Sequence, residues 1–406
     1  MFSQRLKLPL ALAIALSVVF LTWAEAAIAK TPVKLWHAYR AQEKSALEEV
    51  AKRFNAQNKD IQLELLPIPY DAFGDKITAS VPRGKGPDLF IFAQDRVGDW
   101  AASGVVEPVD FWLTDELRSA FLPPSLEALS YDDQIYGLPL AVKMNALIYN
   151  KKLVKTPPKT TEEMIQVAKA LTKGGTFGLV YQNADFWYHG MWLQGFGGRV
   201  FDKKGAPTLD SKEVIDSMKF AQKLAHSSGI MPEEVSSTLV TTLFNQGKAG
   251  MVINGPWFIG EVAKGVDYGI AVLPKLSDAG GKPARPFLSA EGVIMSAKAT
   301  DKKAAFEVMK YLAGVEAGRI MAKLGRQTVA RKAVYDDPEL AKDPVLSVFR
   351  AQLADSVPTP NTPAMRMVWS PATTAMNKII NGKGDAEEAM KAAQAEVAKL
   401  AKGARR

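Results

Sequence analysis

The sequence predicts an α/β protein made of two lobes that face each other across a cleft. Short apolar segments with strand character alternate with amphipathic helical segments along most of the chain, which indicates βαβ units and largely parallel sheets. Residues 30–406 follow a predicted leader, and a chain of that length usually exceeds one hydrophobic core. Because small-molecule sites favour the space between domains, two such lobes indicate a ligand-binding cleft.

The leader, residues 1–29, has the composition of a cleaved signal peptide. Arg5 and Lys7 precede an almost wholly apolar run over 8–21, and small residues follow as far as Ala29. The run is short for a membrane span, which needs about 20 residues, so a membrane-anchoring helix is the weaker alternative. The chain has no cysteine, and therefore no disulfide framework and no cysteine to carry a lipid anchor. We expect export and retention in the periplasm, with secretion into the medium as the alternative.

Strand-like and helical segments alternate in the first part of the exported chain. The pattern predicts a strand at 33–36, a helix over 47–54, a strand at 61–66, a helix near 72–80 and an apolar strand at 88–92. Leu47, Val50 and Phe54 are spaced to share one face of the first helix. These elements form the βαβ units of the first predicted lobe.

The alternation resumes after a possible crossover. The predicted strands lie at 136–142, 146–149, 178–181, 249–254 and 268–273, with a further extended segment at 287–296. The predicted helices lie after the capping box Thr160…Glu163, at 212–226, at 238–245, and after Gly255-Pro256-Trp257. From residue 301 the chain is expected to be mainly helical, and the proline-rich segment 357–363 interrupts it.

The charge pattern and the motifs exclude several function classes. The net charge is +8, but the basic residues are spread along helices as on solvated surfaces, so we expect no nucleic-acid partner. The sequence contains no HExxH, no GxSxG, no Walker A loop and no GxGxxG. The histidines, His37, His189 and His226, lie too far apart for a local metal pair. We predict no metal, no cofactor and no catalytic residue, although two carboxylates meeting across the cleft would still allow a glycosidase.

The tryptophans favour a sugar ligand. After the leader the chain carries Trp36, Trp100, Trp112, Trp187, Trp192, Trp257 and Trp369. An indole plane matches the apolar C–H face of a pyranose ring, and Asp, Arg or Asn matches its rim of hydroxyl groups. Several of these tryptophans lie at strand ends, helix starts or loops beside polar residues. Core packing is the alternative for any single one, since aromatic residues dominate cores.

A set of short segments lies along the exported chain: Gly86–Arg96, Tyr136–Val142, Ala146–Lys151, Pro157–Thr160, Phe244–Lys248, Ile253–Trp257, Tyr268–Pro274, and Pro360–Pro363 followed by Trp369. This ordered set resembles the family-1 extracellular solute-binding proteins, especially the maltodextrin-binding members. The segments occur in the family order and span nearly the whole exported chain.

The resemblance implies the two-lobed periplasmic-binding-protein fold, in which crossing hinge segments let the lobes close on a ligand. It places the N-terminal lobe at 30–141 and 293–338, and the C-terminal lobe at 146–287 and 345–406. It also implies a monomeric, non-enzymatic protein that captures an oligosaccharide such as a maltodextrin. Such a protein delivers its ligand to the membrane permease subunits of an ABC importer.

The resemblance also implies a set of sugar-binding residues. Trp257 and Trp369 match aromatic platforms of the C-terminal lobe, and Trp187 stands where the family places a stacking tyrosine. The matching polar residues are Asp185 on the C-terminal lobe and Asp95, Arg96 and Asp75 on the N-terminal lobe.

Three positions depart from the maltodextrin-binding pattern. Phe92 replaces a tryptophan, Lys143 replaces a glutamate beside the hinge, and Arg40-Ala41 replaces an Asp-Lys pair. A lysine only donates hydrogen bonds, whereas a carboxylate accepts them from sugar hydroxyls. These departures allow the same fold to bind another sugar, such as a galacto- or arabino-oligosaccharide or trehalose. Three further alternatives stay open: the same fold with an ionic ligand, an exported glycan-active enzyme, and a pure interaction module.

Overall fold

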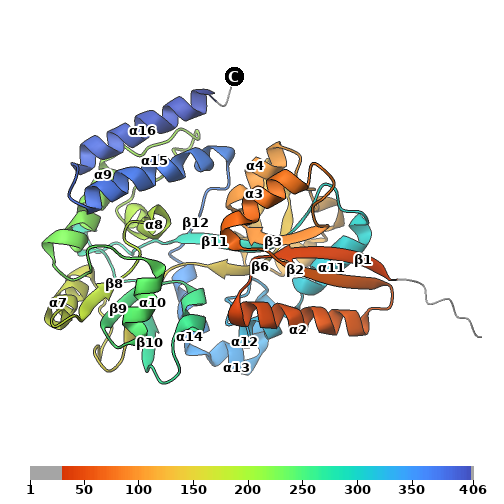
Figure 1. Ribbon diagram of the computed structural model, residues 1–406, viewed down its shortest axis with the longest axis horizontal. Helices are drawn as coiled ribbons and strands as arrows, with labels where there is room; N and C mark the ends of the chain where they lie inside the picture. The colour runs from red at the N-terminus through yellow and green to blue at the C-terminus, as the bar shows by residue number, and fades with distance from the viewer. Residues whose placement is uncertain (1–29, 404–406) are drawn as a thin grey trace, which may run out of the picture.

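The computed structural model describes residues 30–403, which form two lobes side by side (Figure 1). The predicted signal peptide, residues 1–29, lies outside the described residues. Within residues 30–403 we find no helix with the length and apolar character of a membrane span.

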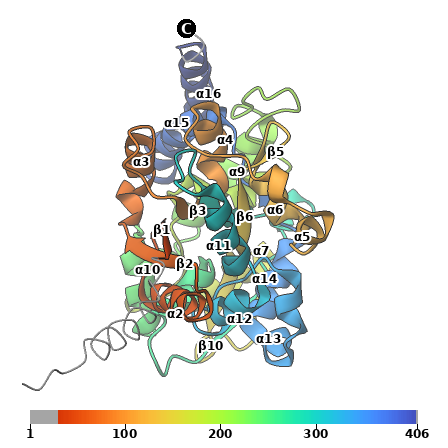
Figure 2. The ribbon, with the colours of Figure 1, turned by 90° about the vertical axis from the view of Figure 1, so that its right-hand side faces the viewer.

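The first lobe contains the N-terminal part of the chain and a later helical segment (Figure 2). Its first elements are β1 (Thr31–His37), α2 (Ala41–Gln57), β2 (Ile61–Pro67), α3 (Tyr70–Ser80), β3 (Leu89–Ala93), the 3-10 helix η1 (Gln94–Arg96), α4 (Val97–Ala102), η2 (Asp110–Trp112), α5 (Asp115–Ser119), α6 (Pro123–Ala128), β4 (Ser130–Tyr131) and β5 (Gln134–Ile135). The later elements are α11 (Lys302–Leu312), α12 (Val315–Lys323) and η6 (Lys332–Asp336).

The sheet of the first lobe joins parallel βαβ strands to a returning antiparallel strand. Its order is β12-β11-β3-β1-β2, with β6 paired to β11. β1 runs parallel to both β2 and β3, so that Leu35 lies opposite Leu65 on one side and Leu89 on the other. Leu47 and Phe54 of α2 are buried against this sheet, as their helical spacing predicts.

The second lobe contains the middle and the end of the chain. Its elements are β7 (Ala146–Asn150), α7 (Thr161–Leu171), β8 (Phe177–Val180), α8 (Phe186–Gly195), α9 (Lys212–Gln222), the π-helical turn η3 (Lys223–Ser227), α10 (Ser237–Asn245), β9 (Ala249–Asn254), η4 (Pro256–Glu261), β10 (Tyr268–Ala271), η5 (Ser277–Ala279), α15 (Pro363–Ile380) and α16 (Ala386–Gly403). In Figure 1, α15 and α16 lie side by side along one end of this lobe.

The sheet of the second lobe is mainly antiparallel, and here the prediction of largely parallel strands is wrong. Its order is β10-β7-β9-β8. β7 pairs antiparallel with β10 and β9, and β8 pairs in parallel with β9. The reason is topological: β7 continues almost directly from the crossing strand β6 instead of following a crossover helix, so its direction is set by the crossing.

Three stretches of chain connect the lobes. β6 (Gly137–Lys143) and β11 (Phe287–Met295) form an antiparallel pair that runs from one lobe to the other (Figure 1). Leu138 packs in the core around Leu35, whereas Val142 packs in the core around Ile148. The third connection comprises α13 (Pro338–Lys342) and α14 (Pro344–Leu353), after which β12 (Val357–Pro358) pairs with the start of β11.

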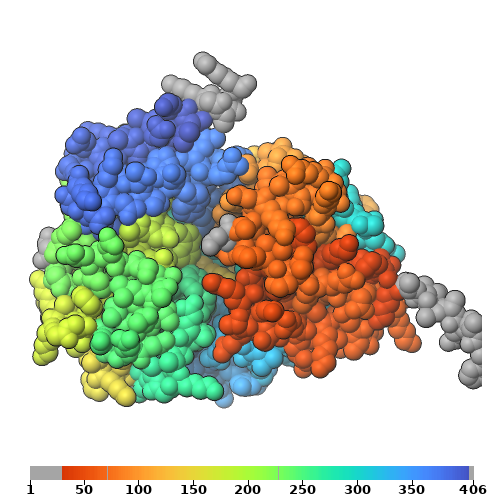
Figure 3. All heavy atoms as spheres, viewed as in Figure 1, coloured from red at the N-terminus to blue at the C-terminus, as the bar shows by residue number. Residues whose placement is uncertain are grey.

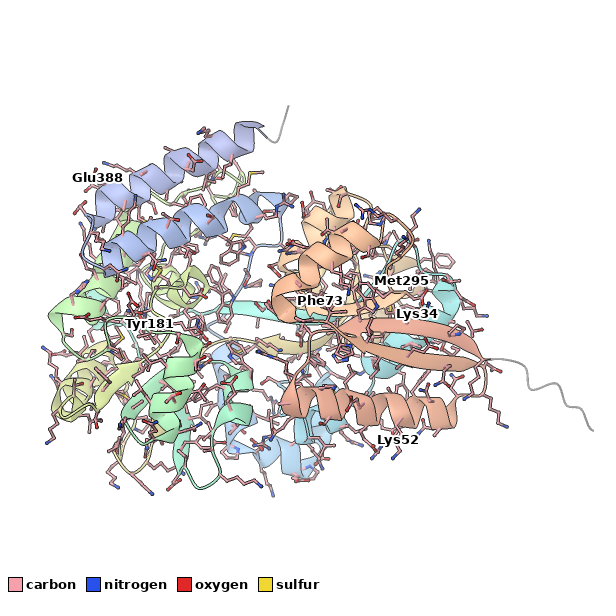
Figure 4. The ribbon with its side chains drawn as sticks, in the orientation of Figure 1. Lys34, Lys52, Phe73, Tyr181, Met295 and Glu388 are labelled. Atoms are coloured by element: carbon pink, nitrogen blue, oxygen red, sulfur yellow. The ribbon has the colours of Figure 1, made fainter. Side chains whose placement is uncertain are left out.

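Local signals near the lobe interface form much as the sequence predicts. The cap of α7 is confirmed: Thr160 Oγ1 accepts a hydrogen bond from the backbone N–H of Glu163 at 3.2 Å. The helix expected after Gly255-Pro256-Trp257 is the short 3-10 helix η4. Large aromatic side chains such as Phe73 and Tyr181 fill the two lobe interiors (Figure 4).

Candidate functional site

Residues of both lobes line a cavity in the groove that separates them (Figure 3). The cavity contains about 570 Å³ of space that is free of protein atoms. Its lining comprises Arg40, Ala41, Gln42 and Glu43 from the start of α2, Pro256, Trp257, Gly260 and Glu261 from η4, Lys143 from β6, and the loop Gly325–Thr328. A side chain on Gly260 would stand 3.6 Å from Gln42 Oε1, so the lobes approach each other closely at this end of the cleft.

The start of α8 brings the aromatic residues of the second lobe together. The half-buried rings of Trp187 and Trp257 lie with their centroids 5.8 Å apart and their planes inclined by 52°. Trp369 on α15 makes an edge contact with Phe186 of α8, at 6.2 Å between centroids. The structure thus gathers the three tryptophans that the sequence singled out around one helix terminus.

Gly255 fixes how the Trp257 ring lies. A Cβ atom at residue 255 would overlap the six-membered ring of the Trp257 indole. The indole is therefore folded onto the backbone of the preceding turn, where only glycine leaves room for it.

Asp185 has a structural task in the α8 terminus. Its Oδ1 accepts a hydrogen bond from the backbone N–H of Trp187 at 2.7 Å, which caps the helix. Burial raises the pKa of Asp185, and the backbone hydrogen bonds partly oppose this change. The carboxylate thereby holds the backbone at Trp187 in the first turn of α8.

Asp95 and Arg96 belong to the first lobe, where β3 runs into η1 and α4. Burial raises the pKa of Asp95 to about 6, against the effect of the neighbouring Arg96 charge. Within residues 30–403, the buried Asp95 Oδ1 has no hydrogen-bond partner. The Arg96 guanidinium packs on Gly74 of α3 and lies 3.3 Å from Oδ1 of the exposed Asp75. Asp95 thus offers an acceptor, while Asp75 mainly orients Arg96.

Phe92 presents no free ring face to the cleft, because other aromatic rings cover it. It is 5% exposed and stacks on Phe73 at 5.1 Å and on Tyr70 at 5.5 Å between centroids. Tyr70 is 55% exposed, yet its buried surroundings and the charge of Asp95 raise its pKa to about 12. The sequence analysis missed Tyr70; its place as the first residue of α3, which packs on β3 through Phe73, is the signal that could have indicated it.

Lys143 is held between two carboxylates. Its Nζ lies 3.2 Å from Glu43 Oε1 and 3.2 Å from Glu291 Oε2. Gln327 donates a hydrogen bond to the same Glu43 oxygen at 2.9 Å. The sequence analysis missed these three partners, which lie on α2, β11 and the loop after α12 and are far apart along the chain.

Arg40 is an exposed residue at the rim of the cavity. It precedes α2 in an extended conformation and makes no side-chain cap for that helix. The next residue, Ala41, has a φ of 43°, in the left-handed region that non-glycine residues seldom adopt. Backbone strain of this kind collects at functional sites, and here it lies in the wall of the cleft.

The sequence profile of the bacterial extracellular solute-binding proteins matches residues 38–319. The chain belongs to this family. It is 30% identical to the maltotriose-binding protein of Pyrococcus abyssi, over 93% of this chain and 84% of the relative. It is 28% identical to the galactooligosaccharide-binding protein of Bacillus subtilis, over 84% of this chain and 83% of the relative.

Solved structures of such proteins share the two-lobed fold. The maltotriose-binding protein of Thermus thermophilus, bound with maltotriose, superposes with a TM-score of 0.82 at 29% identity, over 91% of this chain and 99% of that one. Among residues 30–403, no group of three His, Cys, Asp or Glu side chains could hold a metal ion.

Proposed function

We propose that this solute-binding protein is a periplasmic receptor that captures an oligosaccharide, with an α-linked glucan as the first candidate, and leaves it chemically unchanged. It then delivers the sugar, as a monomer, to the permease subunits of an ABC importer. The observation that carries the proposal is the cluster of Trp187, Trp257 and Trp369 on the second lobe, and the unpaired acceptor of Asp95 on the first lobe supports it. Flat apolar faces suit the C–H face of a pyranose, and an ionised carboxylate suits its hydroxyl groups.

The names of the relatives support the same ligand class. One relative is a maltotriose-binding protein, and another, from Streptococcus pneumoniae, is a maltooligosaccharide ABC transporter solute-binding lipoprotein, 26% identical over 85% of this chain. The candidate site residues are those that the sequence analysis named, Asp95, Arg96, Trp257, Trp369, Trp187, Asp185, Asp75, Phe92, Lys143 and Arg40, and of these Asp95, Arg96 and the three tryptophans are the proposed direct contacts. We assign Asp185 and Asp75 supporting roles, because Asp185 accepts from the backbone N–H of Trp187 and Asp75 pairs with Arg96, and we place Phe92 beneath Tyr70.

A galacto-oligosaccharide is the second candidate ligand. The chain is 28% identical to the galactooligosaccharide-binding protein of Bacillus subtilis, and Lys143 and Arg40 depart from the maltodextrin-binding pattern in the cavity lining. The aromatic wall is compatible with either sugar, because each pyranose has an apolar face.

Calorimetric titration with a sugar panel tests the proposal. Maltose, maltotriose, trehalose, galacto-oligosaccharides and arabino-oligosaccharides are titrated into the exported form of the chain. We expect binding near micromolar, about −8 kcal/mol, with the strongest heat from an oligosaccharide. Absence of heat from every sugar would overturn the assignment. Chromatography of a labelled oligosaccharide after incubation separates a receptor from an enzyme, since a receptor returns it intact.

A further inference from the structure

Lys143 joins the start of α2 to both crossing strands. It is the last residue of β6, Glu43 belongs to the first turn of α2, and Glu291 lies in β11. Each of the three side chains is at most 20% exposed. Both ion-pair distances are 3.2 Å, so the single ammonium group is shared by two carboxylates that the chain brings from separate elements.

Two carboxylates in one poorly solvated site oppose each other's ionisation. Burial raises the pKa of Glu291, the Lys143 charge lowers it, and Glu43 raises it further. Burial alone would lower the pKa of Lys143, but the charges of Glu291 and Glu43 raise it above the usual range of a lysine. The lysine therefore stays charged, and its charge favours the ionised form of Glu291.

Other ionisable groups face this cluster from the surrounding elements. The charges of Glu291 and Glu43 interact with the hydroxyl of Tyr39, which precedes α2. The charges of Asp95, Glu291 and Lys143 interact with the hydroxyl of Tyr70 in α3. Arg40, Arg326 and Glu261 line the same cavity. Asp95 titrates near pH 6 in its own right, so any test has to isolate the contribution of Lys143.

Glu43 presents its carboxylate to the cleft, and Lys143 supports it from the hinge side. Both residues line the cavity, and Gln327 donates to the Glu43 oxygen that also faces Lys143. Glu43 of α2 thus places a hydrogen-bond acceptor beside Lys143. In the maltodextrin-binding pattern, a glutamate stands at the position of Lys143 itself.

We propose that Lys143 is a positioning residue that holds the Glu43 carboxylate in place and keeps Glu291 ionised, so that Glu43 can accept hydrogen bonds from ligand hydroxyl groups. The ligand part of this inference rests on the proposed function, because it requires a hydroxyl-rich ligand. Lys143 itself then donates to the two carboxylates and not to the sugar.

The decisive measurement is the pH dependence of sugar affinity in Lys143→Met and Lys143→Arg, for the sugar that the wild type binds best. An opposite charge this close lowers a carboxyl pKa by about 1–3 units. The midpoint at which affinity is lost on acidification should therefore move up by about 1–3 pH units in Lys143→Met. Lys143→Arg keeps the charge and should retain the wild-type profile. Asp95 contributes equally to all profiles, so the difference isolates Lys143.

The melting temperature of the unliganded protein gives a readout that needs no sugar. In Lys143→Met the pKa of Glu291, which burial already raises in the folded protein, rises further above its unfolded value, because the Lys143 charge that lowers it is gone. A raised carboxyl pKa gives stability that is lost as the pH rises, so the variant should fall further below wild type between about pH 4 and pH 8. If the wild type binds no sugar, the proposed function fails. The pH dependence of the melting temperature still decides whether the Lys143 charge keeps Glu291 ionised.

Lys151→Met is the matched control, because Lys151 forms an exposed ion pair with Asp267, 3.1 Å away and outside the cavity lining. It should change neither profile. If Lys143→Met does not fold, Lys143→Met combined with Glu291→Gln removes one of the two like charges and should fold. The pH at which this double variant loses half of its sugar affinity should lie above the wild-type value. It should lie below the value expected for a site with two unpaired carboxylates. A wild-type affinity profile in Lys143→Met, or a changed ranking of sugars at pH 8, would overturn the inference; the second result would make Lys143 a direct contact.

Discussion

Replacing Trp257 by alanine tests whether the aromatic wall binds sugar or only packs the second lobe. The half-buried indole of Trp257 lines the cavity and rests on the Gly255 backbone. Its ring centroid lies 5.8 Å from that of Trp187. Its exposed face is the part available to a ligand. The substitution removes that face together with the contact to Trp187.

The expected loss of affinity follows from the area and geometry of the ring. Covering about 50 Å² of indole at about 25 cal/mol per Å² is worth about 1.2 kcal/mol. By analogy with aromatic pairs, ring stacking adds about 0.5–1.5 kcal/mol. Together these terms predict an affinity about 20- to 100-fold weaker, measured by calorimetry with the preferred sugar.

Trp112→Ala is the matched control, because Trp112 is also half-buried but stacks on Phe306, 5.4 Å between centroids, in the first lobe. Both variants should lose a few degrees in melting temperature, since a half-buried indole contributes only part of the about 3–5 kcal/mol of a fully buried one. Only Trp257→Ala should lose affinity. Wild-type affinity in Trp257→Ala, or a collapse of its melting temperature that accounts for the weaker binding, would refute the reasoning.

The remaining predictions concern closure, the acceptor and the glycine. Sugar that contacts both lobes makes more contacts in the closed form than in the open form, and therefore shifts the balance toward the closed form. The radius of gyration measured by small-angle scattering should then fall, and an unchanged scattering profile at saturating sugar contradicts a hinge mechanism. Between about pH 4 and pH 6 wild type should lose stability, because the buried Asp95 carboxyl with its raised pKa ionises less readily in the folded than in the unfolded protein. Asp95→Asn should escape this loss, and equal melting curves of the two proteins across that range contradict the raised pKa of Asp95. Asp95→Ala should weaken binding by about 1–3 kcal/mol, the cost of buried hydroxyl groups that lose their acceptor, and unaltered calorimetry would exclude the contact. Gly255→Ala should displace the Trp257 indole and weaken binding, and tryptophan fluorescence should report the movement.

The fold of the first lobe could be predicted because its signals are local. The alternation of β1, α2, β2 and α3 follows from strand and helix periodicities that operate within a few residues. The antiparallel sheet of the second lobe could not be predicted in this way. The direction of β7 depends on its near-direct continuation from β6, which is a property of the connection and not of the strand sequence.

The candidate site shows the same division between local and distant information. Trp187 and Asp185 are named from the family resemblance, and the structure links them locally, since Asp185 accepts from the backbone N–H of Trp187 two residues on. The partners of Lys143 could not be named, since Glu43 and Glu291 are about 100 and 148 positions away in the chain. Phe92 looked like an available ring because nothing in its own segment indicates that Tyr70 covers it.

The position of the Lys143 cluster in the crossing ribbon bears on how the lobes move. The pairing of β6 with β11 shifts register between Glu291 and Gly292, which leaves Leu140 as an extra residue on β6. Such a bulge weakens the ladder locally and lets a ribbon bend. Leu288, before the shift, packs in the second lobe, while Val293, after it, packs in the first. We therefore expect the bend between the lobes to be centred on Glu291. A group at the pivot moves least during closure, so the ion pairs of Lys143 can keep the Glu43 acceptor in place in both the open and the closed form.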